Sequence, residues 1–179
     1  MRGFFGVGVE GISKAGNVGN LFRSAHGFGA SFLFLVAPDP RMEFPSDTSA
    51  SQRSLPVYTY AGIDDMRLPE GCQLVGVELT ADAVDLPSFH HPHGAAYVLG
   101  PERGSLSPAM LERCEHVVRI PTSFCINVAT AGAIVMYDRM RALGRFAHRP
   151  VSPIMPAEPL PHHVHGDPIS RKRPPRRDR

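Results

Sequence analysis

Short apolar runs separated by polar turns recur along most of this 179-residue chain. Phe4 to Glu10 alternates glycine with apolar residues and predicts a strand, and helically spaced apolar residues from Leu21 to Phe28 predict a helix after it. Ser31 to Val36 is a continuous apolar run that stops at a pair of prolines. Such a run is typical of a strand buried on both faces of a parallel sheet.

The pattern repeats further along the chain. Leu74 to Leu79, Ala95 to Leu99 and Val117 to Ile120 predict three more strands, and Asn127 to Leu143 predicts a long helix with an apolar face. Met42 to Leu55 is a candidate helical connector, although a proline and several serines interrupt it. Strands that alternate with helices indicate an α/β fold, with a mostly parallel sheet flanked by helices.

Composition changes near residue 148. Residues 1–147 carry 12 Lys/Arg and 14 Asp/Glu, a formal net charge of −2, whereas residues 148–179 carry 7 and 3, a net charge of +4. The second segment is rich in proline and has few apolar residues to offset the entropy of ordering. We therefore predict a folded domain at 1–147 and a disordered, basic tail at 148–179.

The tail ends in a basic cluster, which can attract a phosphate backbone without reading its sequence. A solubilising tail is the alternative. The residues of this candidate RNA-binding cluster are Arg171, Lys172, Arg173, Arg176 and Arg177.

The cysteines and histidines give little sign of a metal site. Cys72, Cys114 and Cys125 are widely spaced and form no CxxC pair, so neither a disulfide framework nor a zinc site is indicated. We therefore expect the protein to be located in the reducing cytoplasm. His90-His91-Pro92-His93 lacks a second group of ligands, and its proline breaks any helical face, so a surface loop is favoured and no metal is expected. We see no signal-type segment and no apolar run near the roughly 18 residues of a membrane span.

Three polar blocks follow one another along this framework: Asn17 to Arg23 (NVGNLFR), Gly100 to Gly104 (GPERG), and Ile120 to Asn127. In the first, two asparagines flank glycine in a turn that leads into a helix bearing an arginine, which predicts an anion site. In the second, glycines after an apolar strand let a ligand approach the backbone. The third opens the long helix and offers a second anion site.

Each block also has a purely structural interpretation. Asn17, Asn20 and Asn127 are suitable helix caps. Arg23 is an ordinary solvated charge in that interpretation, and Glu102 an exposed residue of a strand-to-helix turn. The residues alone leave these alternatives open.

Taken together, the three blocks resemble the three motifs of the SpoU/TrmH class of SPOUT RNA methyltransferases, over most of the first 145 residues. The resemblance implies a C-terminal trefoil knot, S-adenosylmethionine as cofactor, and a homodimer in which one protomer's cofactor pocket meets an arginine of the other. The implied reaction is methylation of an RNA ribose 2′-hydroxyl by direct displacement. We expect transfer RNA rather than ribosomal RNA, because we see no extra N-terminal RNA-binding domain.

The resemblance also implies roles for particular residues. Arg23 would contact the RNA phosphate and the ribose hydroxyl. Because a guanidinium is effectively always protonated, we interpret it as a positioning and stabilising group rather than a general base. The implied catalytic residues are Arg23, Asn17, Glu102 and Asn127, and the implied cofactor-binding residues are Val77, Gly100, Ile120, Cys125 and Ile126.

Two departures from the family pattern suggest alternatives. Cys125 stands where the family usually has serine, and the loop that follows Ile120-Pro121 is shorter. A catalytically weak homologue that binds RNA would fit these departures. A nucleotide-binding enzyme of another class is disfavoured, because the chain has neither a GxxxxGK[ST] loop nor a correctly spaced GxGxxG.

Overall fold

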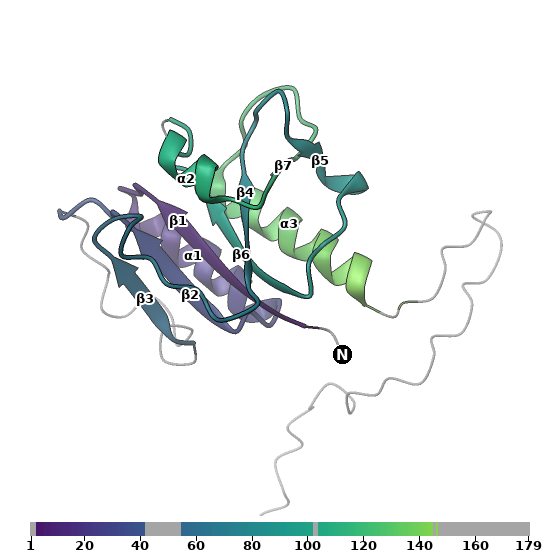
Figure 1. The fold of residues 1–179 in the computed structure, drawn as a ribbon, viewed down its shortest axis with the longest axis horizontal. Coiled ribbons are helices and arrows are strands. Elements are labelled where there is room, and N and C mark those ends of the chain that lie inside the picture. The colour runs from purple at the N-terminus through teal and green to yellow at the C-terminus, as the bar shows by residue number, and fades with distance from the viewer. Residues whose placement is uncertain (1–2, 42–54, 102–103, 145, 147–179) are drawn as a thin grey trace, which may run out of the picture. The chain divides into compact units, whose positions relative to one another are not determined.

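The computed structural model describes residues 3–41, 55–101, 104–144 and 146. Within them, strands alternate with helices (Figure 1). The elements in chain order are β1 (Phe4–Glu10), α1 (Ala15–Gly27), β2 (Phe32–Val36), β3 (Val57–Tyr60), β4 (Gln73–Val77), β5 (Val84–Asp85), a short 3₁₀ helix η1 (Leu86–Ser88), β6 (Gly94–Leu99), α2 (Pro108–Arg113), β7 (His116–Arg119) and α3 (Val128–Leu143).

The strands form one sheet in the order β3-β2-β1-β6-β4-β7-β5, and every described pair of neighbours is parallel. β1 lies between β2 and β6, with Gly6 opposite Phe32 on one side and Ala96 on the other. Because all strands run the same way, their carboxyl ends meet at one edge. The predicted α/β fold with a mostly parallel sheet is confirmed.

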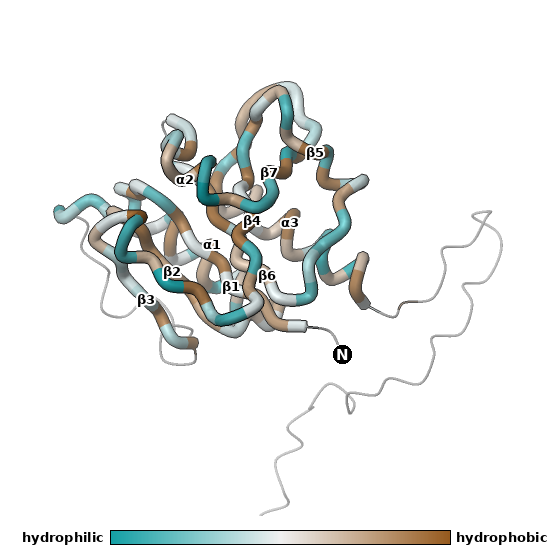
Figure 2. The backbone as a smooth tube through the Cα atoms, viewed as in Figure 1, coloured by the Kyte–Doolittle hydropathy of each residue, from teal (hydrophilic) through white to brown (hydrophobic). Residues whose placement is uncertain are grey.

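One face of the sheet is covered by α1 and α3, which lie next to each other behind it (Figure 1). The core cluster on this face includes Val7 and Val9 of β1, Leu33 and Leu35 of β2, and Tyr97 of β6. α1 contributes its apolar stripe to the same cluster, and α3 adds Val135 and Met136. The unbroken apolar run of β2 stands out in Figure 2.

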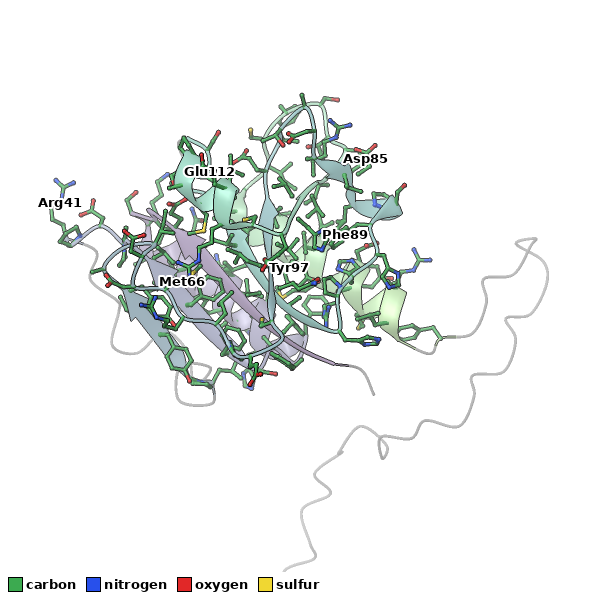
Figure 3. All side chains as sticks on the ribbon, viewed as in Figure 1. Arg41, Met66, Asp85, Phe89, Tyr97 and Glu112 are labelled. Atoms are coloured by element: carbon green, nitrogen blue, oxygen red, sulfur yellow. The ribbon has the colours of Figure 1, made fainter. Side chains whose placement is uncertain are left out.

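The opposite face carries α2 and the segment between β3 and β4. Phe32 and Phe34 pack here with Met66, which is labelled in Figure 3, and Met110. A Cβ atom at Gly6 would lie 2.2 Å from the Phe32 ring, and one at Gly8 would lie 2.4 Å from the Phe34 ring. The glycines that alternate in β1 therefore make room for these two rings.

Most of the sequence-based element predictions are confirmed, but the start of the first helix is wrong. α1 begins at Ala15, so Asn17 and Asn20 lie in its first two turns and not in a preceding turn. Lys14 is the N-cap and makes no side-chain capping bond. The buried stripe of α1 already starts at Val18, so packing outweighs the poor helix propensity of glycine and asparagine.

Several short elements were not predicted: β3, β5, η1 and α2, each with six residues or fewer. The candidate connector at Met42 to Leu55 lies almost entirely outside the described residues. The tail at 148–179 and its basic cluster also lie outside them, so the predicted boundary and tail stay predictions. No helix in the part of the chain that the structure describes is long and apolar enough to cross a lipid bilayer.

The chain order around β7 bears on the implied knot. β7 lies between β4 and β5, two strands that one connection joins. The helix before β7, α2, packs on one face of the sheet, and the helix after it, α3, packs on the other. The chain thus passes from one face to the other beside this connection. The trefoil knot itself stays a prediction from the resemblance.

Candidate active site

A cavity of about 410 Å³ lies at the carboxyl ends of β4, β6 and β7, where the N-termini of α1 and α3 also converge. Ligands of parallel α/β sheets typically bind at this edge. The lining combines apolar side chains, backbone of the loops after β6 and β7, and a few polar groups. Its residues are Lys14, Asn17, Val77, Glu78, Leu79, Leu99, Gly100, Pro101, Gly104, Ile120, Thr122, Cys125, Ile126, Asn127, Val128 and Ala131.

Two asparagines join the first and third blocks. The Asn127 Nδ2 donates a hydrogen bond to the Asn17 Oδ1 at 3.1 Å. The Asn127 Oδ1 accepts from the backbone amides of Ala129 at 2.9 Å and Thr130 at 3.4 Å. Asn127 is therefore both the N-cap of α3 and a bridge to α1. The positive ends of both helix dipoles face this corner of the cavity.

Arg23 does not line the cavity. It is exposed on α1, six residues after Asn17, which corresponds to about 9 Å along the helix axis. Within one chain the structure therefore brings Asn17 to the cavity without Arg23.

Glu102 and Arg103 lie outside the described residues. Their neighbours Gly100, Pro101 and Gly104 all line the cavity. A Cβ atom at Gly100 would lie 3.0 Å from the Leu106 amide nitrogen, so glycine lets the loop fold tightly back on the end of β6. The described residues of the second block thus form part of the cavity wall.

Two glutamates that the sequence analysis did not select hold this loop. The Leu106 amide donates to the Glu78 Oε2 at 2.8 Å, and the next amide, of Ser107, donates to the Glu10 Oε2 at 2.9 Å. The Ser107 hydroxyl also donates to the Glu10 Oε1 at 2.6 Å and accepts from the Met110 amide at 3.1 Å, which caps α2. A glutamate placed directly at the carboxyl end of an apolar strand was the sequence signal for both.

All five residues expected at the cofactor line the cavity, and so do Asn17 and Asn127. Val77, Ile120 and Ile126 are partly buried against the core cluster of the α1/α3 face, while Cys125 is exposed. Leu99, Val128 and Ala131 add apolar surface to the cavity, although strand and helix patterns explain them as core. Lys14, Glu78, Leu79 and Thr122 also line it and were not predicted.

At the other end of the sheet, His91 is buried, contrary to the expected surface loop for its segment; only 1% of the residue is exposed. Its Nε2 lies 3.0 Å from the Asp138 Oδ2, and its Nδ1 lies 2.6 Å from the Tyr97 Oη. A carboxylate only accepts, so the Nε2 carries hydrogen and the Nδ1 accepts from Tyr97, as in a neutral imidazole. Burial lowers the pKa of His91, against the opposing effect of Asp138, and burial raises the pKa of Tyr97 to about 12.

Arg139 completes this network. It is 3% exposed, and it donates to the carbonyls of Phe4, Pro92 and His93 and to the Tyr97 Oη. Its guanidinium also lies over the rings of Phe5 and Tyr97 (Tyr97 is labelled in Figure 3). The cluster thus fastens the end of α3 to the amino ends of β1 and β6. Among the described residues, no group of three or more His, Cys, Asp or Glu side chains could hold a metal ion.

The family model for the SpoU rRNA Methylase family matches residues 5–137. The chain belongs to that family. The SpoU match runs from the second residue of β1 into α3, so it includes the three polar blocks and the whole cavity lining.

Relatives within this family modify different RNAs. The chain is 25% identical over 142 residues to the tRNA (guanosine(18)-2'-O)-methyltransferase of Escherichia coli K12, covering 75% of this chain and 62% of the relative. It is 26% identical over 168 residues to the 23S rRNA (uridine(2479)-2'-O)-methyltransferase of Streptomyces viridochromogenes, covering 82% and 56%.

A solved structure agrees with the fold. The SpoU methyltransferase AviRb from Streptomyces viridochromogenes, in complex with the cofactor AdoMet, superposes with a TM-score of 0.65 at 26% identity, covering 77% of this chain and 60% of that one. The chain therefore spans about three-fifths of the length of these bacterial relatives.

Proposed function

We propose that this SpoU-family chain transfers a methyl group from S-adenosylmethionine to a ribose 2′-hydroxyl of RNA. The observation that carries the proposal is the single cavity that gathers Asn17, Gly100 and Asn127, one residue from each polar block. These blocks are far apart in the sequence, and described residues of all three meet at this cavity at the sheet edge.

The cavity fits the cofactor in size and chemistry. Its volume of about 410 Å³ is within the range usual for small-molecule sites. Apolar side chains such as Val77, Ile120 and Ile126 suit an adenine ring. On the β1 side, Lys14 and the converging N-termini of α1 and α3 suit the methionine carboxylate.

When bound, S-adenosylmethionine supplies a methyl group activated by its sulfonium. The chain's own residues would hold this cofactor and orient it toward the ribose hydroxyl. Asn17 and Asn127 are fixed by their mutual hydrogen bond, and the loop after β6 is fixed by Glu10 and Glu78. Rigid alignment of two reactants can lower a barrier by about 7 to 11 kcal/mol, so such a frame needs no strong base.

Arg23 reaches the site, we propose, from a second copy of the chain. Arg23 is exposed and lies away from its own cavity. The neighbouring helix α3 also exposes apolar side chains on one side: Ile134 (37%), Tyr137 (48%) and Met140 (36%). An exposed apolar strip of this kind favours a protein interface. A homodimer would cover it and supply the arginine to the partner's RNA phosphate, where the planar guanidinium binds two oxygens.

Transfer RNA remains the proposed substrate. The named relatives include enzymes for transfer and for ribosomal RNA at nearly equal identity, so the experiment must offer both. The cytoplasm remains the proposed compartment, which suits three cysteines that are all free thiols.

The test uses S-adenosylmethionine labelled on the methyl group, with transfer and ribosomal RNA that lack the modification offered separately. After digestion to nucleosides, we expect label on a 2′-O-methyl nucleoside from transfer RNA. Arg23→Ala should abolish it, and Arg23→Lys should lose most of the rate because it loses the planar fork. His26→Ala, an exposed change on the same helix, is the matched control and should methylate normally.

Three results would contradict parts of the proposal. Label on a base rather than a ribose would overturn the reaction, and label only on ribosomal RNA would overturn the substrate class. Cofactor binding without transfer to any RNA would favour the catalytically weak, RNA-binding homologue that Cys125 and the shorter loop suggest.

A further inference from the structure

We propose that Glu78 recognises the 2′- and 3′-hydroxyls of the cofactor ribose. This inference rests on the proposed function, because it concerns the same cavity and the same cofactor. It assigns a binding role to a side chain that the three polar blocks do not include.

Glu78 is placed for this role by β4. It is the residue that follows the last residue of the strand, it is half-buried, and it lines the cavity. Its Oε1 accepts from the Leu79 amide at 2.9 Å, and its Oε2 accepts from the Leu106 amide at 2.8 Å. Two backbone donors therefore hold the carboxylate in one orientation.

The carboxylate still has acceptor capacity. Each carboxylate oxygen can accept about two hydrogen bonds, and the described contacts use one on each. Two adjacent acceptors remain, and they offer no donor. The ligand group that matches them has two adjacent donors, as the cis-diol of a ribose does.

Charge on the opposite side of the cavity indicates which part of the cofactor lies near Glu78. Lys14 follows β1, and Glu78 follows β4, with β6 between these two strands. Two strand spacings separate β1 from β4 by about 10 Å. The methionine carboxylate suits the Lys14 side, and the ammonium stays with it because both are attached to the same carbon. The ribose, on the far side of the sulfur, is then the group that faces Glu78.

Glu78 has a second role that an experiment must separate from the first, since it also anchors the loop after β6. Glu10 provides the matched control. It holds the next residue of the same loop, Ser107, and it does not line the cavity. Glu10→Gln and Glu78→Gln change the same functional group in the same way, but only Glu78 can touch the ligand.

The experiment is calorimetric titration with S-adenosylhomocysteine, its 2′-deoxy and 3′-deoxy analogues, and methylthioadenosine, which keeps the ribose and lacks the amino acid. We expect the wild-type protein to bind S-adenosylhomocysteine about tenfold or more tightly than either deoxy analogue, since each loses a hydrogen bond to a charged acceptor. In Glu78→Gln this ratio should fall to about threefold or less. In Glu10→Gln all the affinities should fall together and the ratio should stay.

A wild-type protein that binds the deoxy analogues as tightly as S-adenosylhomocysteine overturns the inference without any variant, so a poorly folding variant does not hide the answer. Glu78→Gln that weakens S-adenosylhomocysteine but not methylthioadenosine would place Glu78 at the ammonium and overturn the ribose assignment. A wild-type protein that binds none of the ligands would overturn the proposed function as well.

Discussion

The two ends of the sheet differ in how their polar groups are used. At the amino end, Arg139, Tyr97 and His91 are almost fully buried, and they bond to one another and to backbone carbonyls. At the carboxyl end, Asn17, Glu78 and Asn127 line an open cavity. Both ends are joined to α3. The same helix is thus fixed to the sheet by buried hydrogen bonds at one end and lines the cavity at the other.

Replacement of Arg139 at the amino end of the sheet should destabilise the protein more than any other change proposed below. Arg139→Met would remove the guanidinium hydrogen bonds to the carbonyls of Phe4, Pro92 and His93. The His93 carbonyl would keep the Phe4 amide as a donor. We expect the free energy of unfolding to fall by about 3 kcal/mol or more, because a hydrogen bond from a charged donor contributes about 1.5 to 3 kcal/mol and several are lost together.

Chemical denaturation measures this effect. Arg141→Met, an exposed change on the same helix, is the control and should stay within about 0.5 kcal/mol of the wild type. A loss below about 1 kcal/mol in Arg139→Met would show that α3 is held mainly by its apolar packing against α1.

The free energy of unfolding measured at several pH values tests the same region. Burial lowers the pKa of His91 in the folded protein, so the unfolded chain takes up the proton first as pH falls. Stability from this residue is present above the unfolded pKa of about 6.5 and is lost as pH falls toward the lowered folded pKa, by up to about 1.4 kcal/mol per pH unit.

Denaturation at several pH values between 5 and 7.5 tests this slope. His91→Asn should reduce it, whereas His90→Asn, an exposed neighbour, should leave it unchanged. Equal slopes in the wild type and both variants would mean that His91 does not stay neutral in the fold.

At the carboxyl end, Asn127 permits a separation of stability from binding. Asn127→Ala removes the cap of α3 and should cost about 1 kcal/mol. Asn127→Asp keeps the capping oxygen but replaces the donor that reaches Asn17 by an acceptor. We expect its stability to stay within about 0.5 kcal/mol of the wild type while its affinity for S-adenosylhomocysteine falls about tenfold.

Denaturation and calorimetry on the same preparations measure both effects. If Asn127→Asp bound S-adenosylhomocysteine normally, Asn127 would be a cap only, and the contrast between the two ends would lose its clearest example.

Replacement of Cys125 should change stability and binding least. Its side chain is exposed, and a thiol is a weak hydrogen-bonding group. Cys125→Ser should leave stability within about 0.5 kcal/mol and change the affinity for S-adenosylhomocysteine by no more than about threefold. If Cys125→Ser bound S-adenosylhomocysteine more than about threefold more tightly, or transferred methyl groups faster, the cysteine would be shown to weaken the site of the wild-type protein.

The sequence predicted what depends on local patterns. Apolar runs located the long strands and α3, and the three polar blocks, read with the family resemblance, selected seven residues that line one cavity. The first helix was predicted to start too late because glycine and asparagine look like turn residues, whereas the structure shows a buried stripe that begins at Val18. Tertiary packing overrides such local preferences.

Other features depend on partners that are distant in the sequence. Glu10 and Glu78 are ordinary strand-end residues until the loop after β6 folds against them, 97 residues after Glu10 and 28 after Glu78. His91 looked like part of a surface loop because nothing nearby in the sequence reveals Tyr97 and Asp138 as its partners. The polarity of a residue and of its neighbours in the sequence does not predict which distant residues it contacts.

The order of the strands has a consequence for how the protein is made. β1 pairs with β6, and the cavity combines residues from Lys14 to Ala131, so its wall is complete only after α3 has left the ribosome and docked. Folds dominated by such non-local pairs fold slowly. Binding of S-adenosylhomocysteine during synthesis would therefore report the end of folding. We expect a nascent chain that stops before α3 not to bind this ligand.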